Sequence, residues 1–227
     1  MKRLAAPLLI GLIGAAILVA LGVWQMQRLA WKEGILHEIE STISGAPAPL
    51  PGSYDPATDR YQPVALEGAI GSGELHVLVS QKRQGAGYRI IAPFTTAEGR
   101  TILIDRGFVP NDAKDASRRI GETAIRANLH APEERSGFTP DNETGRNIWF
   151  ARDVGAMAEA LGTEPILAIV REETPPAPGI DPLPVSSEGI PNDHLQYAIT
   201  WFSLAAVWLG MTLVWVRRRS FVQEVRT

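Results

Sequence analysis

The sequence contains no cysteine among its 227 residues. This absence excludes disulfide bonds, thiolate zinc sites and covalently attached c-type haem, which needs a C-x-x-C-H motif. Any exported domain in the chain must therefore be held together by its apolar core, and a segment of more than 150 residues is long enough to build one.

Motifs of soluble enzymes are also missing. The sequence has no G-x-S-x-G, H-E-x-x-H, P-loop or dinucleotide-binding fingerprint, and its acidic residues form no evident general acid/base pair. The formal net charge of −3 and the acidic middle of the chain argue against a nucleic-acid partner, which favours a basic stripe. We therefore predict a protein that is not an enzyme, with a membrane-tethered enzyme as a weaker alternative.

Charge is absent from two long stretches. Leu4 to Trp24 gives 21 uncharged residues and Leu195 to Val216 gives 22, each long enough to cross a bilayer as a helix. A signal peptide is the alternative for the first stretch, but this run is longer than the usual apolar region and no A-x-A cleavage pattern ends it. The sequence predicts two retained transmembrane helices and, with them, contact with membrane lipid.

Basic residues at the chain ends predict the topology. Lys2 and Arg3 precede the first span and the arginine run 217–219 follows the second, whereas residues 25–193 hold 16 basic against 24 acidic residues. Short basic flanks set orientation, and a long loop crosses largely regardless of its charge. Both termini are expected in the cytoplasm, and the central domain is expected outside.

The chain between the spans divides into segments by composition and periodicity. Apolar residues at helical spacing extend the first helix to about Gly45, and a Pro-rich stretch from Thr174 to Asp193 reads as an extended tether. The expected segments are an N-terminal transmembrane helix at 1–24, a helical stalk at 25–45, a periplasmic domain at 46–173, the tether at 174–193, a second transmembrane helix at 194–216 and a basic tail at 217–227.

The central domain shows strand-like patterns. The stretches that alternate or are rich in β-branched and aromatic residues are "ELHVLVS", "YRIIAPF", "RTILIDRGFV", "AIRANLH" and "PILAIVRE". A short helix is expected between Asp153, its N-cap, and Gly162, its stop. The prediction is an α+β domain, mainly antiparallel β with one or two helices, whose sheet could curl into a barrel.

Three histidines and one tripeptide are expected to have no chemical role. His37, on the stalk, and His76 and His130, on the polar faces of strands, are expected to be solvated surface residues. Asp105-Arg106-Gly107, within a strongly apolar strand, is expected to be structural or to face a partner, with Gly107 supplying a backbone φ that other residues resist.

His194 differs from these histidines because it begins the second span, in "NDHLQYAITWF". On a helical wheel, Tyr197, Trp201, Trp208 and Trp215 lie within roughly 60° of it. A neutral imidazole above an aromatic face could ligate the iron of a flat conjugated ring. The plainer interpretation is an interfacial anchor, because Trp and Tyr are enriched at both membrane interfaces.

The first span carries small residues on one face. Gly11, Ala15 and Gly22 stack along it, and small residues let a neighbouring helix approach closely. Packing of the two spans is the simple interpretation, and it is compatible with a cofactor lying between them.

Four stretches together resemble the Surfeit-locus family of cytochrome c oxidase assembly factors. They occur in the family's order over nearly the whole chain, as "LGVWQMQRLAWK", "GYRIIAPF", "ILIDRGFVP" and "NDHLQYAITWF". The resemblance implies a role in maturing haem–copper oxidase, in or near the step that places haem a in subunit I. It also implies that the haem a synthesis machinery is a partner.

In bacterial relatives, the histidine at the position of His194 is associated with haem binding. The resemblance therefore makes His194 the axial ligand of haem iron, with Tyr197 and Trp201 beside the ring. A scaffold that stabilises oxidase subunits without binding haem remains the alternative. The chain begins directly with its first span, without an Arg- and Ser-rich transit segment, so a bacterial plasma membrane is expected.

Overall fold

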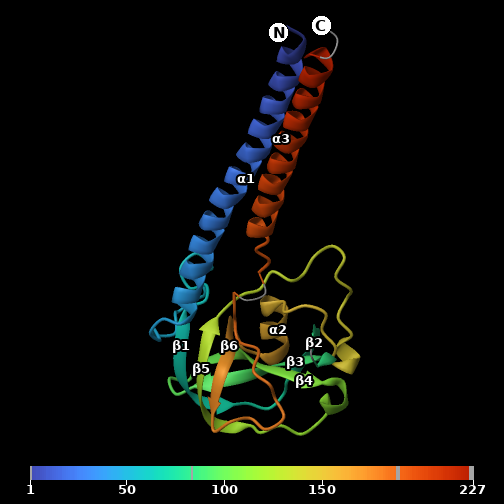
Figure 1. Ribbon diagram of the computed structural model, residues 1–227. Helices are drawn as coiled ribbons and strands as arrows, with labels where there is room; N and C mark the ends of the chain where they lie inside the picture. Colours follow the sequence, from blue (N-terminus) through green and yellow to red (C-terminus); the bar gives the residue numbers. More distant parts are fainter. Residues whose placement is uncertain (1, 83, 188–189, 225–227) are drawn as a thin grey trace. The chain divides into compact units, whose positions relative to one another are not determined.

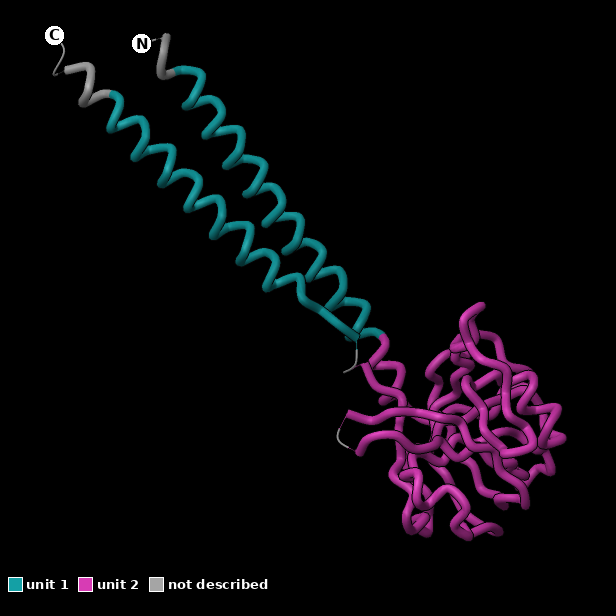
Figure 2. The backbone as a smooth tube through the Cα atoms, turned by 90° about the vertical axis from the view of Figure 1, so that its right-hand side faces the viewer, with its two compact units in different colours: residues 1–38, 188–227 teal, residues 39–187 magenta. Residues whose placement is uncertain are grey.

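A computed structural model describes residues 2–82, 84–187 and 190–224, with side chains from residue 5 to residue 219 within these ranges. The chain divides into two compact units, one of residues 1–38 with 188–227 and one of residues 39–187 (Figure 2). The elements, labelled in Figure 1, are α1 (Lys2–Ile43), β1 (Pro63–Ile70), β2 (Leu75–Gln81), β3 (Gly85–Thr96), β4 (Thr101–Pro110), η1 (Asn111–Ala113), β5 (Gly121–Leu129), η2 (Thr144–Arg146), α2 (Val154–Leu161), β6 (Glu164–Thr174) and α3 (His194–Glu224).

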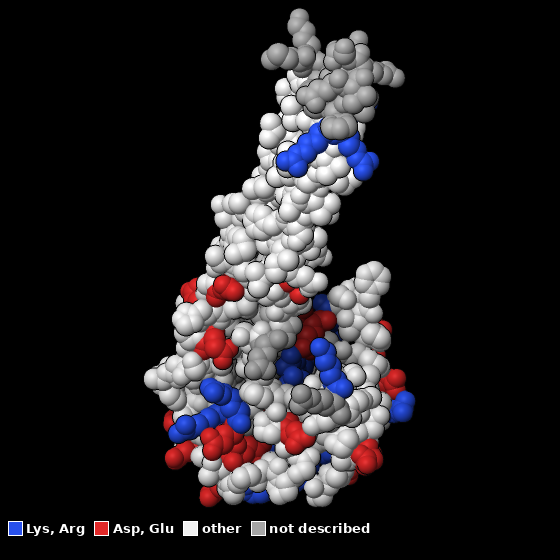
Figure 3. All heavy atoms as spheres, viewed as in Figure 1, with Lys and Arg blue, Asp and Glu red and all other residues white. Residues whose placement is uncertain are grey.

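The first unit is an antiparallel pair of long helices, α1 and α3, which lie side by side in Figures 1 and 2. The segments Ala5–Ile43 and His194–Arg219 are long and apolar enough to cross a membrane. Apolar side chains exposed all round the pair, such as Leu9, Ile13 and Val207, suit a lipid solvent. Figure 3 shows the same feature as an uncharged band of surface next to the arginine run 217–219.

The second unit is built around a small barrel. The strand order β1-β5-β6-β4-β3 closes on itself because β1 also pairs with β3. β3 is long enough to pair with two strands along one edge. Its first half pairs with β2 and its last residues pair with β1, while β4 lies along its other edge. Among the described strands, β4 and β6 form the one parallel pair, and the other pairs are antiparallel. The predicted class, a mainly antiparallel α+β domain with a barrel-like sheet between two long apolar helices, is confirmed.

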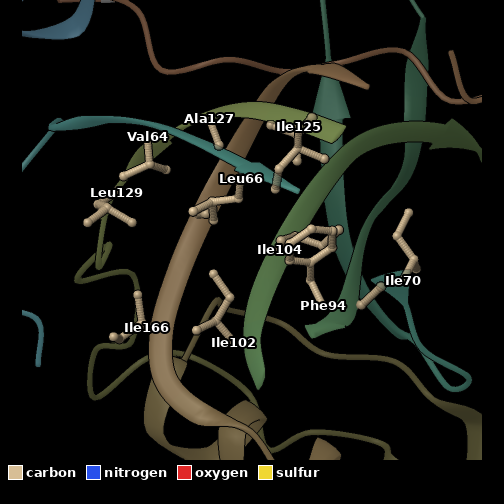
Figure 4. Close-up of a cluster of buried hydrophobic side chains, with 13 residues drawn as sticks. Val64, Leu66, Ile70, Phe94, Ile102, Ile104, Ile125, Ala127, Leu129 and Ile166 are labelled. Atoms are coloured by element: carbon tan, nitrogen blue, oxygen red, sulfur yellow. The ribbon is translucent and has the colours of Figure 1, made fainter. Parts of the chain in front are cut away.

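Alternate residues of the five barrel strands fill its interior. Phe94, Ile102, Ile104 and Leu129 are each fully buried there, and Figure 4 shows these side chains pointing toward one another. Successive side chains of a strand point to opposite faces, so the residues next to these in the sequence point out of the barrel.

A second apolar layer covers the outer face of part of the barrel. Helix α2 packs Met157 and Ala158 against Leu103 of β4 and against Leu167 and Ile169 of β6. Both faces of β4 and β6 are therefore buried, which explains why their sequences are continuous apolar runs rather than alternating ones. The ends of α2 are as predicted: the side chain of Asp153 accepts the N–H of Ala156, and Gly162 adopts the left-handed conformation.

The end of α1 is fixed by residues far away in the sequence. The carbonyl oxygen of Ile43 accepts hydrogen bonds from Asn128 Nδ2 and from Arg171, each at 2.9 Å. The last carbonyls of a helix lack partners within the helix. Side-chain donors from β5 and β6 supply one here, and α1 ends two residues before the predicted Gly45.

The Pro-rich segment was predicted to be an extended tether, but part of it packs on the domain. Ile180 is buried against the domain, and Asp181 exchanges backbone hydrogen bonds with Phe108 at 2.8 and 2.9 Å. The compact unit accordingly extends to Ser187. Prolines lack an N–H and keep this segment out of the sheet, but the residues between them are free to pair with its edge.

Candidate functional site

The two long helices meet along a seam with heptad spacing. On α3 the seam contains His194, Ala198, Trp201, Ala205, Trp208 and Thr212, at alternating intervals of four and three residues. Ala198 and Ala205 are almost fully buried there. This spacing is that of two helices packed knobs-into-holes.

Glycines of α1 receive the large side chains of α3. A Cβ atom added to Gly22 would come within 2.6 Å of the Phe202 ring, and one added to Gly14 would come within 2.6 Å of Trp208 Nε1. Gly11 is equally close to Thr212. In lipid, such close van der Waals packing is what holds helices together, and part of the aromatic face of α3 is therefore covered by α1.

His194 is held at one end of this seam by a polar residue of α1. Its Nδ1 lies 2.7 Å from Oε1 of Gln25, whose side chain is buried. Oε1 can only accept a hydrogen bond, so Nδ1 is the donor, and in the neutral imidazole this arrangement leaves the lone pair on Nε2. In metalloproteins, a hydrogen bond of this kind fixes the tautomer and the orientation of a ligating imidazole.

A small pocket of about 220 Å³ lies beside this imidazole. Gln25 and Lys32 of α1 line it, together with Pro191, Asp193, His194 and Tyr197. Lys32 Nζ also donates a hydrogen bond to the carbonyl oxygen of Pro191. The pocket thus combines an imidazole nitrogen, a cation, a carboxylate and an aromatic edge, and two contacts to α1 hold the start of α3 and the turn before it.

The structure brings two of the three predicted site residues together. His194 and Tyr197 line the pocket, and Tyr197 is 56% exposed. Trp201 does not line it and is half-buried on the seam with α1.

Gln25 and Lys32 are site residues that the sequence reasoning missed. A signal was present, because Gln25 follows an uncharged run and a polar residue within a membrane span is a functional candidate by default. The partner of Gln25, 169 positions away, was not visible in the sequence.

Ion pairs make a second buried polar cluster inside the domain unit. Asp105, which is fully buried, accepts from Arg89 at 2.7 Å and from Arg152 at 3.2 Å. Its neighbour Arg106 forms a two-pronged pair with Glu173 at 2.8 and 2.9 Å. The charges compensate one another within the domain, which is compatible with the structural role predicted for Asp105-Arg106-Gly107.

Gly107 has the unusual backbone conformation that was predicted. Its φ is +123°, and a Cβ atom there would collide with the carbonyl oxygen of Asp181. The strand can therefore pair with the Pro-rich segment only if this residue is glycine.

The expectation of solvated histidines is wrong for His76 and His130. His76 is 5% exposed and its Nε2 lies 2.7 Å from Glu74. His130 stacks on Tyr61 with ring centroids 5.1 Å apart, and its Nδ1 is buried without a partner among the described residues. His76 lies in β2, where the backbone N–H of Trp149 donates to its carbonyl oxygen, and the half-buried His130 directly follows β5. Strand alternation cannot reveal contacts with residues so distant in the sequence.

Acid should weaken the domain through His130. Burial, followed by the nearby Arg152 and Arg60, lowers the pKa of His130 to about 4. Because the unfolded pKa is higher, the unfolded chain binds more protons between these values, and stability is lost as the pH falls from about 6.5 toward 4. We expect the His130→Gln variant to lose less stability than the wild type between pH 7 and pH 5, measured as the fall in Tm on thermal unfolding. Identical slopes for the two proteins would contradict this assignment.

Comparison with known proteins places most of the chain in one family. The sequence profile of the SURF1 family matches residues 12–206. Surfeit locus protein 1 of Xenopus tropicalis is 32% identical over 231 residues, covering 91% of this chain and 73% of its own length. The human protein of the same name is 33% identical over 214 residues, covering 82% and 69%. The SURF1-like protein of Drosophila melanogaster is 29% identical over 227 residues, covering 87% and 72%. The chain belongs to the SURF1 family of cytochrome oxidase assembly factors.

Proposed function

We propose that this protein is an integral membrane assembly factor for haem–copper cytochrome c oxidase that binds haem a and assists its insertion into subunit I. It acts as a carrier or chaperone, not as a catalyst, and the haem a synthesis machinery is its donor partner. Membership of the family supports the oxidase context, and the pocket at His194 supports haem binding.

The observation that carries the proposal is the hydrogen bond between His194 Nδ1 and the buried Gln25. Placing an amide inside a helix pair costs free energy unless its hydrogen bonds are satisfied. Here the amide oxygen orients a neutral imidazole so that Nε2 is available. Such a nitrogen is an axial ligand for haem iron, which supplies the redox-active centre that the oxidase needs.

The residues present fit a haem that is only partly enclosed. A pocket of about 220 Å³ is below the roughly 300–1,000 Å³ of sites that enclose a small molecule. It can take the ring edge next to the imidazole, with Tyr197 beside it, and leave the rest of the ring against lipid or a partner. The ammonium group of Lys32, on the same pocket, is placed to pair with a propionate. Partial enclosure suits a protein that must pass its haem on.

The test is an absorbance spectrum of the full-length protein purified in detergent from cells that make haem a. We expect a Soret band of a histidine-ligated haem at close to one haem per chain. Protein from matched cells that lack haem a synthesis provides the baseline. Haem-free protein from the haem a-making cells would contradict haem binding.

A scaffold that holds oxidase subunits without haem is the second candidate. The small size of the pocket and the absence of Trp201 from its lining favour it. In that case the protein purified from haem a-making cells would be colourless but would still bring oxidase subunit I with it.

We also propose that both termini are cytoplasmic and that the barrel unit lies on the periplasmic side of a bacterial plasma membrane. The antiparallel helix pair brings residues 2 and 224 to the same end, where the arginine run 217–219 is exposed. Lys2 and Arg3, the other half of the charge argument, have side chains outside the described residues. Reporter fusions after residue 224 should be active only in the cytoplasm, and fusions at the exposed residue Asp141 only outside. A periplasmic C-terminus would contradict this topology.

A further inference from the structure

An apolar groove of about 370 Å³ runs along the helix pair near its basic end. Ile10 and Gly11 of α1 line it opposite Trp208, Met211 and Trp215 of α3. The volume lies within the range of small-molecule sites, unlike that of the pocket at His194.

The few polar atoms of this groove are already used. Trp208 Nε1 donates to the carbonyl oxygen of Gly11 at 2.9 Å, so its indole presents hydrocarbon faces. The hydroxyl of Thr212 donates to the carbonyl oxygen of Trp208 at 2.8 Å. No charged residue is among the lining residues in the described part of the chain. The groove therefore suits an uncharged hydrocarbon chain and not a porphyrin with its carboxylates.

The groove and the His194 pocket open on the same side of the seam. Counting about 100° per residue from His194, Tyr197, Trp208, Met211 and Trp215 all fall on one side of it. Trp208 lies 14 residues beyond His194, which is about 21 Å along the helix axis. Leu204, exposed on the same side, continues the apolar path between the two sites.

We propose that this groove receives the isoprenoid tail of haem a while His194 holds the iron. Haem a differs from haem b in carrying a long hydroxyethylfarnesyl chain, an uncharged branched hydrocarbon that extends from one edge of the ring. A ring at His194 sends that chain along the aligned apolar path toward Trp208 and Met211. This inference rests on the proposed haem binding. It adds a reason for the protein to prefer haems that carry the farnesyl chain. The groove residues of α3 lie beyond the family match, which ends at residue 206.

Binding of the tail can be tested separately from binding of the ring by comparing haem o, which carries the farnesyl chain, with haem b, which lacks it. Full-length haem-free protein in detergent is titrated with each haem, and the Soret band is followed. We expect the wild type to bind haem o about tenfold more tightly, a moderate factor because packing rather than hydrophobic transfer drives association in a lipid-like medium. Met211→Trp, which fills the groove, should abolish this preference and keep the affinity for haem b.

Leu213→Trp is the matched control. It adds the same ring to the same helical turn, but Leu213 lies on the opposite side of α3 and does not line the groove. It should keep the preference for haem o. Ile10→Trp, which fills the groove from α1, should behave like Met211→Trp.

Each outcome decides between the two proposals. Equal affinities of the wild type for both haems would overturn the tail site while leaving haem binding intact, and would assign the groove to bilayer acyl chains. A Met211→Trp protein that keeps the preference, or loses both haems equally, would also overturn it. Failure of the wild type to bind either haem would overturn the proposed function and the tail site together.

Discussion

Replacing His194 with alanine is expected to abolish the haem spectrum while the protein still inserts and purifies normally. The imidazole Nε2 is the proposed iron ligand, and alanine offers no atom in its place. The fall in affinity should exceed the roughly 10–100-fold loss that outer-shell substitutions cause at metal sites. His194→Met should retain haem with a shifted spectrum and a higher reduction potential, because thioether ligation raises it.

Gln25 provides the internal comparison for this result. Gln25→Leu keeps the size of the side chain but removes the acceptor for Nδ1, 2.7 Å away, so it should lower affinity by about 10–100-fold. Gln27→Leu removes an exposed amide two residues along the same helix and should have no effect. An unchanged spectrum in His194→Ala would leave the histidine as an interfacial anchor only and would require another ligand.

Replacing Asp105 with alanine is expected to cause the largest loss of stability in the domain unit. The carboxylate is fully buried between Arg89 and Arg152 and also accepts the N–H of Gly107. Removing it leaves two arginine side chains facing each other with only Glu134 to compensate them. Breaking a buried pair in this way costs about 3–5 kcal/mol, on the order of 10 °C in Tm for a domain of this size.

The matched control for Asp105 is Asp115→Ala. Asp115 pairs with Lys114 at 3.4 Å, but its side chain is 85% exposed, and exposed pairs contribute little. Thermal unfolding in detergent, followed by circular dichroism in the β region, separates the two variants. A wild-type Tm for Asp105→Ala would mean that the arginines find other partners and that the cluster is not structural.

The periodicity of the sequence was sufficient for most of the fold. Alternating and continuous apolar runs predicted the strands, and Asp153 and Gly162 predicted the ends of α2, because these features depend on neighbours within a few residues. Closure of the barrel did not follow from periodicity, since it depends on β3 pairing with β1 at one end and with β2 at the other. The burial of His76 and the partial burial of His130 were missed for the same reason, because their neighbours Trp149 and Tyr61 come from elsewhere in the chain.

For the candidate site, the sequence by itself determined that two apolar spans frame the domain and that an imidazole begins the second span. The uncharged runs have the length of a bilayer, and His194 stands at the edge of one of them. Only the tertiary structure decided what that imidazole can do. The antiparallel pairing of α1 and α3 brings Gln25 to His194, leaves Trp201 half-buried and outside the pocket, and forms the groove at Trp208 on the side that Tyr197 faces. Helical periodicity fixes which residues share a face, whereas the residues that cover that face depend on the partner helix.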